Sequence, residues 1–200
     1  MKLLYPLAKR FIAGYDFDSA KKNIDKLLGE GYEVSIDYLG ELSENEDDCI
    51  IAKNQYLHII DIYKDEKIDI SIKPTQLGIL INKERALASL LDIVIEANEH
   101  DHTVRLDMEG SEVTRETIEL CMEVFNAWKV GYAIYIGDMP FINASAAGIA
   151  LQANLFRTNE DIDKLIKTEA VSIRLVKGAY REDSKIAYKK ESEIRSCFFD

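Results

Sequence analysis

The sequence predicts an α/β fold built on a parallel sheet. Apolar residues recur with helical spacing in several segments, and short apolar runs lie between these segments. Strands that alternate with helices in this way form parallel βαβ units, because a parallel neighbour needs a long crossover connection. The expected strand ends Tyr38, Lys73 and Asp107 follow one another at intervals of 35 and 34 residues. This spacing is close to the roughly 31 residues per unit of a (β/α)8 barrel, and it favours a barrel over an open sheet.

Five amphipathic helices are expected, each with apolar residues three and four positions apart. In chain order, their apolar stripes are Ala20, Ile24, Leu27 and Leu28; Tyr56, Ile59, Ile60 and Tyr63; Leu87, Leu90, Leu91 and Val94; Ile118, Cys121, Met122 and Phe125; and Ile162, Leu165 and Ile166. Asn82 and Thr158 are the expected N-caps of two of them, and Asp161 follows Thr158 at capping-box spacing. The acidic residues from Glu44 to Asp48 are expected at a helix start, where negative charge is favourable.

Five short apolar runs that end in polar residues are expected as buried strands. They are Val34–Tyr38, Ile68–Lys73, Thr103–Met108, Gly148–Asn154 and Val171–Lys177. By the barrel spacing, these strands and their helices form about five of eight units, preceded by an N-terminal helix. We therefore expect an incomplete (β/α)8 TIM-type barrel, and a single domain over residues 1–200 because no linker interrupts the chain. The segment Lys129–Ala147 fits none of these elements and is either an extra strand or a loop insertion.

The composition predicts a folded cytoplasmic protein that does not bind nucleic acid. The net charge of −11 has the wrong sign for neutralising phosphates, and 47% hydrophobic residues exclude a disordered chain. No apolar stretch reaches the roughly 18 residues of a membrane span, and the N-terminus lacks a signal-peptide pattern. The three cysteines form no C-x-x-C pair and are expected as reduced thiols. No metal site is expected, because His100 and His102 come without a third-ligand pattern.

Polar residues at the ends of the expected strands are the candidate functional residues. They are Lys73, Asp107, Gln152, Arg174 and Lys177. In parallel barrels the loops at the carboxyl ends of the strands build the active site, and a cation in a buried strand needs an anionic partner or a ligand. One interpretation is a structural bridge in which Arg174 or Lys177 pairs with Asp107. The other is a ligand site, beside which Gly178 and Ala179 let the backbone approach a flat or phosphorylated ligand.

Six segments, in one order, resemble the proline dehydrogenases, in their small monofunctional bacterial form. The segments are Ala8–Gly14, Ser35–Glu41, Ser71–Gly78, Arg105–Ser111, Leu151–Leu155 with Arg157-Thr158, and Ile173–Tyr180. An ordered set of this kind is far more specific than a single short motif. The resemblance implies a TIM-type barrel of the proline dehydrogenase kind that holds FAD. It implies oxidation of L-proline to 1-pyrroline-5-carboxylate by hydride transfer to the flavin N5, with electrons passed to a membrane quinone.

The resemblance also implies roles for individual residues. Lys73 would meet the proline carboxylate, and Asp107 would belong to the substrate pocket. Gln152 and Arg174 would hydrogen-bond the isoalloxazine, with Arg174 near N5, where its charge would stabilise the reduced flavin. The other expected ligand contacts are Val176, Lys177 and Gly178 along the flavin, and Ala179 and Tyr180 on the substrate side. A quinone acceptor would bring the protein into peripheral contact with the inner face of the cell membrane.

The chain departs from the family pattern at two places. Asn154 stands where the family commonly has an aromatic residue or a histidine. The chain also ends at Asp200, before the tyrosine of the eighth strand and the paired arginines that complete the family's carboxylate clamp. An inactive, truncated remnant that persists as a homo-oligomer is therefore an alternative, because open sheet edges favour association. A third hypothesis is a Schiff-base aldolase-type barrel that uses Lys73 or Lys177.

Overall fold

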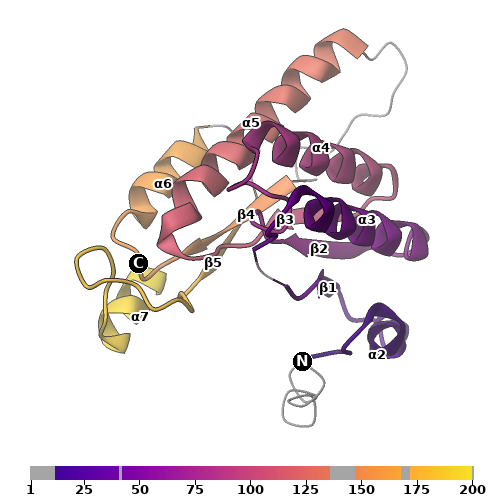
Figure 1. Ribbon diagram of the computed structural model, residues 1–200. Coiled ribbons are helices and arrows are strands. Elements are labelled where there is room, and N and C mark those ends of the chain that lie inside the picture. Colours follow the sequence, from indigo (N-terminus) through magenta and orange to yellow (C-terminus); the bar gives the residue numbers. More distant parts are fainter. Residues whose placement is uncertain (1–11, 41, 136–146, 168–171, 200) are drawn as a thin grey trace.

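The computed structural model describes residues 12–40, 42–135, 147–167 and 172–199, and of residues 127–135 it describes the backbone only. Helices and strands alternate along the described chain (Figure 1). In order they are α2 (Phe17–Gly29), β1 (Val34–Asp37), α3 (Glu46–Ile62), β2 (Ile68–Ile72), α4 (Lys83–Glu99), β3 (Thr103–Leu106), α5 (Ser111–Tyr135), β4 (Ala147–Gln152), α6 (Thr158–Ile166), β5 (Ser172–Val176) and α7 (Glu191–Phe199). No helix among the described residues has the length and apolar character needed to cross a membrane.

The five strands form one parallel sheet in the order β1-β2-β3-β4-β5. Helices α3, α4 and α5 lie side by side over one face of this sheet (Figure 1). A doubly wound fold would reverse its strand order and place helices on both faces, whereas successive units of a barrel keep chain order and one helical face. The sheet is therefore of the barrel type that the sequence predicts. Within the described residues, β1 and β5 form its two edges.

The hydrophobic core lies between the sheet and its helices. Ile68, Ile70 and Ile72 of β2 are almost completely buried and belong to the same cluster as Tyr56 and Leu90 of the neighbouring helices. Alternate residues of a strand point to opposite faces, so Asp69 and Ser71, which lie between these isoleucines, point away from the core. Each fully buried aliphatic side chain contributes about 1.5–3 kcal/mol to folding. The expected apolar stripes are confirmed as the inner faces of the helices, except at Leu27 and Ile166, which are 41% and 63% exposed.

Three helix starts have side-chain N-caps, including the one predicted at Asn82. Asp16, Asn45 and Asn82 each precede a helix in an extended conformation, and each side chain accepts a hydrogen bond from a backbone N–H in the first turn. The N-cap predicted at Thr158 is wrong. Thr158 is the first residue of α6, and its hydroxyl donates to the carbonyl oxygen of Gln152 instead. Asp161 pairs with Arg157 rather than completing a capping box.

Two other expectations about element boundaries change. The strands end one or two residues earlier than predicted, so that Lys73 and Asp107 lie just after β2 and β3. Of the segment Lys129–Ala147, residues 129–135 continue helix α5, which overturns the prediction of an extra strand or a loop there. Residue 147 begins β4. Residues 136–146 lie outside the described part of the chain.

Replacing Gly78 with alanine is expected to lower the free energy of unfolding by about 1–3 kcal/mol. Gly78 has a φ of +84°, and a Cβ atom there would lie 2.6 Å from the Sγ atom of Cys49. Gly29→Ala is the matched control, because an added Cβ meets no atom within 4 Å at that position. Chemical denaturation of the two variants measures the difference. Equal stability of the two variants would contradict the assigned strain at Gly78.

Candidate active site

The face of the sheet opposite the helices carries polar and charged side chains. They are Ser35 and Asp37 on β1, Asp69, Ser71 and Lys73 on and after β2, Arg105 and Asp107 on and after β3, and Ser172 and Arg174 on β5. Three carboxylates and three cations therefore share this face. Because they alternate in sequence with the buried core residues, the strand pairing alone brings them together. They form two layers, one at the carboxyl ends of the strands and one nearer the amino ends.

Lys73 is the centre of the layer at the carboxyl ends, which we call the upper cluster: Asp37, Lys73, Asp107, Arg174 and Ser71. The Nζ atom of Lys73 lies 3.3 Å from a carboxylate oxygen of Asp37 and 3.4 Å from one of Asp107. The other oxygen of Asp107 accepts a hydrogen bond from Arg174 at 3.0 Å. Arg174 also donates to the hydroxyl of Ser71 at 3.3 Å. The four charged groups sum to zero, so the cluster is neutral as a whole.

The electrostatic environment keeps Lys73 charged. Its side chain is only 10% exposed, and burial alone would lower the pKa of its ammonium group. Asp37 and then Asp107 outweigh this effect, so the pKa of Lys73 lies above its usual value. A buried ammonium with carboxylate partners holds its proton at neutral pH. Lys73 is therefore a cation available to an anionic ligand and not a free amine.

The layer nearer the amino ends, which we call the lower cluster, contains Ser35, Asp69, Arg105 and Ser172. Asp69 accepts hydrogen bonds from Ser35 at 2.6 Å and from Arg105 at 3.2 Å. Arg105 also reaches Ser172 on β5 at 3.3 Å, across β4. Gly148 of β4 makes room for this crossing, because a Cβ there would lie 3.1 Å from the guanidinium. The lower cluster thus links four of the five strands beneath the upper one.

A buried amide joins the loops that follow β1 and β2. The Nε2 atom of Gln76 donates to the carbonyl oxygens of Tyr38 at 2.9 Å and Gly40 at 2.8 Å. Its Oε1 atom accepts a hydrogen bond from the hydroxyl of Tyr56, which is completely buried. These contacts tie the backbone directly after Asp37 to the backbone directly after Lys73. These hydrogen bonds thereby fix the positions of Asp37 and Lys73, two members of the upper cluster.

The carboxylate of Glu109 makes a second link between loops. It accepts hydrogen bonds from the backbone N–H and from the hydroxyl of Thr75, at 3.0 and 2.5 Å. The backbone carbonyl of Glu109 in turn accepts from the side-chain amide of Gln152 at 3.0 Å. Glu182 binds the backbone N–H of Ser111 at the start of α5 at 3.0 Å. Loops from β2, β3, β4 and β5 are therefore connected around the same end of the sheet.

Comparison with known proteins identifies the family. A family model described as proline dehydrogenase matches residues 20–196. The chain belongs to the proline dehydrogenase family. Proline dehydrogenase 1 of Bacillus subtilis subsp. natto is 30% identical over 186 residues, which cover 90% of this chain and 55% of that protein. Proline dehydrogenase 2 of Bacillus subtilis (strain 168) is 28% identical and covers 94% and 57%. The chain spans about half the length of these curated relatives.

A solved structure shares the fold of this proline dehydrogenase family member. It is a crystal structure of proline utilization A from Bdellovibrio bacteriovorus inactivated by N-propargylglycine. The match has a TM-score of 0.77 and 23% sequence identity, and it covers 98% of this chain and 24% of the other. Proline utilization A of Bradyrhizobium japonicum matches over 74% of this chain with a TM-score of 0.54. These likenesses confirm the predicted fold class.

The structure brings three of the predicted site residues of this family member into direct contact. Lys73, Asp107 and Arg174 form one chain of ion pairs. The structural bridge between Arg174 and Asp107 that the sequence left open is present. Asp37 completes the cluster and was not among the predicted site residues. The alternation of residues along β1 could have indicated this position, because it places Asp37 on the same face as Ser71 of β2 in the sheet register.

The other predicted site residues lie around β4 and β5. Gln152 is 2% exposed, and both ends of its amide have protein partners, the carbonyl of Glu109 and the backbone N–H of Ala179 at 3.4 Å. Val176 ends β5 opposite Gln152. Lys177, Gly178 and Ala179 are exposed, and Tyr180 is half-buried. Their roles toward a flavin or a substrate stay predictions.

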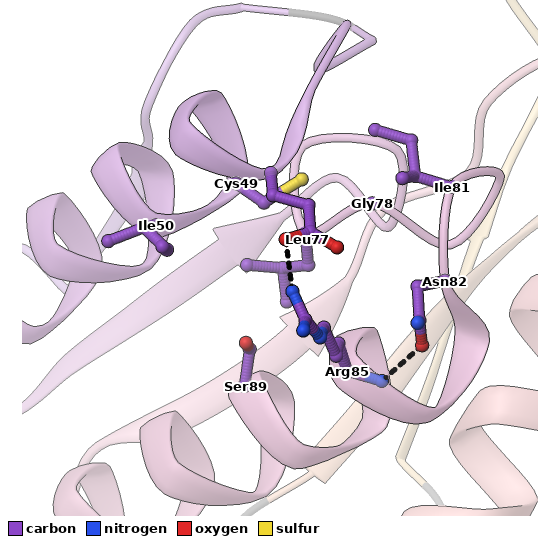
Figure 2. Close-up of a pocket in the computed structure, with 9 residues that line it drawn as sticks. Cys49, Ile50, Leu77, Gly78, Ile81, Asn82, Arg85 and Ser89 are labelled. Atoms are coloured by element: carbon purple, nitrogen blue, oxygen red, sulfur yellow. Dashed lines mark hydrogen bonds and ion pairs between the residues drawn. The ribbon is translucent and has the colours of Figure 1, made fainter.

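A small pocket lies apart from these residues, between the first turns of α3 and α4. Figure 2 shows that Cys49 and Ile50 border it on one side and Arg85 on the other. The side-chain oxygen of Asn82 accepts a hydrogen bond from the backbone of Arg85 at 3.0 Å, and Arg85 pairs with Glu46. The pocket measures about 60 Å³, whereas sites for small molecules usually enclose about 300–1,000 Å³. It is not the site of a flavin.

Within the residues that the structure describes, no three side chains of histidine, cysteine, aspartate or glutamate gather as a metal site. His102 is buried directly before β3, and burial lowers the pKa of its imidazole. All three cysteines are free thiols, as predicted. Cys121 lies in the core, where burial raises its pKa to about 12 and makes it unreactive.

Proposed function

We propose that this chain carries out the FAD-dependent oxidation of L-proline to 1-pyrroline-5-carboxylate. The hydrogen on C5 of proline would leave as a hydride to the flavin N5, and the ring nitrogen would lose a proton. A C=N bond would form between C5 and the ring nitrogen. The observation that carries the proposal is the neutral upper cluster at the carboxyl ends of the strands, in a chain of the proline dehydrogenase family. A zwitterionic amino acid fits a site that offers charges of both signs and no net charge.

The residues of the upper cluster have distinct tasks in this reaction. Lys73 would bind the proline carboxylate, and its raised pKa keeps it cationic for that purpose. Asp37 and Asp107 hold its ammonium group between them before proline binds. Asp107 also holds the Arg174 guanidinium in place, which would stabilise negative charge near the reacting ring. Positioning and charge compensation are what hydride transfer requires of a protein, because the cofactor supplies the redox chemistry.

The residues along β4 and β5 fit a flavin. The Nε atom of Arg174 is buried and has no hydrogen-bond partner among the described residues, which leaves a donor for a ring atom. Gly178 has a φ of +106° and an exposed backbone, so a flat ligand can approach it closely. Gln152, Val176 and Lys177 would complete the lining. When bound, the flavin accepts the hydride.

Two further parts of the proposal rest on the family alone. Electrons would pass from the reduced flavin to a quinone. The quinone would bring the protein into peripheral contact with the membrane. Pairing of the β1 and β5 edges in a homo-oligomer is a separate proposal, supported by the position of these two strands at the edges of the sheet within the described residues.

An inactive remnant is the second candidate, and one observation favours it. Every residue of β5 is only half-buried, and α7 contains no buried residue. By contrast, all but the first residue of β4 are buried. The β5 end of the sheet is therefore held more weakly than the rest, and this end carries Arg174. The Schiff-base hypothesis is weakened at Lys73, because that chemistry needs an amine with a lowered pKa.

The visible spectrum tests the proposed function. The purified chain is incubated with FAD, desalted and mixed anaerobically with L-proline, and D-proline is the control. We expect flavin bands that stay with the protein and that bleach with L-proline only. Flavin that is retained without bleaching would reject the oxidation and favour the remnant. Loss of all flavin on desalting would reject the role of FAD as well.

A further inference from the structure

Asn154 lies two residues beyond β4 and has an unusual side-chain environment. Its backbone is held at both ends, since its N–H donates to the carbonyl of Lys177 at 3.1 Å and its carbonyl accepts from Tyr188 at 2.8 Å. The side chain is 5% exposed. Its Oδ1 atom has no hydrogen-bond partner in the described part of the chain. Buried polar atoms are nearly always paired in native proteins, so this acceptor calls for a partner.

The position of Oδ1 indicates where that partner comes from. The amide lies directly beneath Gly178, where a Cβ would lie 2.1 Å from Oδ1. Gly178 and its neighbours Lys177 and Ala179 are exposed. On the other side, Gln152 receives the backbone N–H of Ala179. The unpaired oxygen therefore faces the backbone of Gly178 at the rim formed by the ends of β4 and β5.

We propose that Asn154 Oδ1 accepts a hydrogen bond from a hydroxyl or N–H group of the bound flavin. The inference rests on the proposed function, which places a flavin against residues 176–178. A flavin offers the matching chemistry, because its ribityl chain carries hydroxyl donors and its ring carries an N–H donor. Proline offers only its ring nitrogen as a donor, and its carboxylate is already assigned to Lys73. Asn154 is thus a cofactor-binding residue, and the protein tolerates an unpaired acceptor without the cofactor.

Protein stability and cofactor affinity together distinguish a cofactor-binding role of Asn154 from a purely structural one. Removing a buried and unsatisfied acceptor leaves the cofactor-free protein as stable as before or more stable. The same change removes a hydrogen bond from the complex and weakens cofactor binding. A residue that serves only to hold the loops together would instead lower stability and leave the affinity unchanged.

The test compares three variants in the full chain. Asn154→Leu keeps the size of the side chain and removes its hydrogen bonding, whereas Asn154→Asp keeps a carboxyl oxygen as acceptor. Asn159→Leu is the control, because Asn159 is an exposed amide at the start of α6. The Kd for FAD is measured by quenching of flavin fluorescence, and the Tm is measured on the cofactor-free proteins.

We expect Asn154→Leu to raise the Kd for FAD about tenfold, with an unchanged or higher Tm. Asn154→Asp is expected to bind within about threefold of the original chain, and Asn159→Leu to change neither quantity. A lower Tm of Asn154→Leu together with unchanged affinity would overturn the assignment while the proposed function stands. If the original chain itself binds no FAD, the cofactor role fails together with the assignment of Asn154.

Discussion

Lys73→Met is expected to lower the kcat/KM for proline-dependent flavin reduction by about 30-fold to a few thousandfold. Truncating one partner of a buried, hydrogen-bonded charge pair costs about 2–5 kcal/mol, and each 1.4 kcal/mol is tenfold. Methionine keeps the apolar stem of lysine and removes the charge that would meet the proline carboxylate. Asp107 keeps Arg174 as a partner at 3.0 Å in this variant, so we expect the fold to survive.

Binding of cyclopentanecarboxylate separates recognition from chemistry. This compound has the ring and carboxylate of proline but no amine, so it depends on Lys73 without being oxidised. We expect its Kd to rise with Lys73→Met and to stay unchanged with Lys185→Met, which removes an exposed lysine of the loop after β5. Equal affinity in both variants would show that the carboxylate binds elsewhere.

The pH dependence of stability tests the upper cluster without cofactor or substrate. The folded-state pKa of Lys73 is raised above 10.5, so its ion pairs contribute their full stability below that pH. The contribution is lost as the pH rises through the folded-state pKa, because Lys73 then loses its charge in the folded protein too. The original chain should therefore lose more stability than Lys73→Met above pH 10.5. Parallel curves would contradict the proposed ion pairs.

Tyr56→Ala is expected to lower the free energy of unfolding by about 3–5 kcal/mol, the largest stability effect of any single change proposed. Tyr56 is completely buried, and its ring packs edge-on against Tyr38 with the centroids 6.0 Å apart. Alanine leaves a cavity where the ring was and removes the hydroxyl that donates to Gln76. The amide of Gln76, which joins the loops after β1 and β2, then loses one of its three hydrogen-bond partners.

Tyr56→Phe separates the cavity from the hydrogen bond. It keeps the ring and leaves Oε1 of Gln76 without the Tyr56 donor, which costs about 1–3 kcal/mol. Tyr32→Ala is the matched control, because Tyr32 is 60% exposed. Urea denaturation of the three variants should give the order Tyr56→Ala, Tyr56→Phe, Tyr32→Ala, from the least to the most stable. A Tyr56→Phe variant as stable as the original chain would show that Gln76 is held by its two backbone contacts alone.

Local patterns in the sequence predicted the elements well, because such patterns act over a few residues. The helical stripe through Ile118 and Cys121 lies in the core, and Asn82 caps α4 as expected. The cap prediction failed because a more distant partner competed. Thr158 is no cap, because the carbonyl of Gln152, six residues earlier, binds its hydroxyl. Helix α5 runs on to Tyr135, although the segment from Lys129 was predicted as an extra strand or a loop insertion.

The amino-acid sequence by itself determined the parallel α/β architecture, the order of its units and the residue types at the strand ends. Hydrophobic periodicity and crossover length act locally along the chain, and they suffice for this. Only the tertiary structure decided which charges meet. Lys73 binds carboxylates 36 and 34 residues away, and Arg174 reaches Asp107 across 67 residues. The unpaired oxygen of Asn154 was equally invisible in the sequence, because a missing partner is a property of everything that packs around an atom.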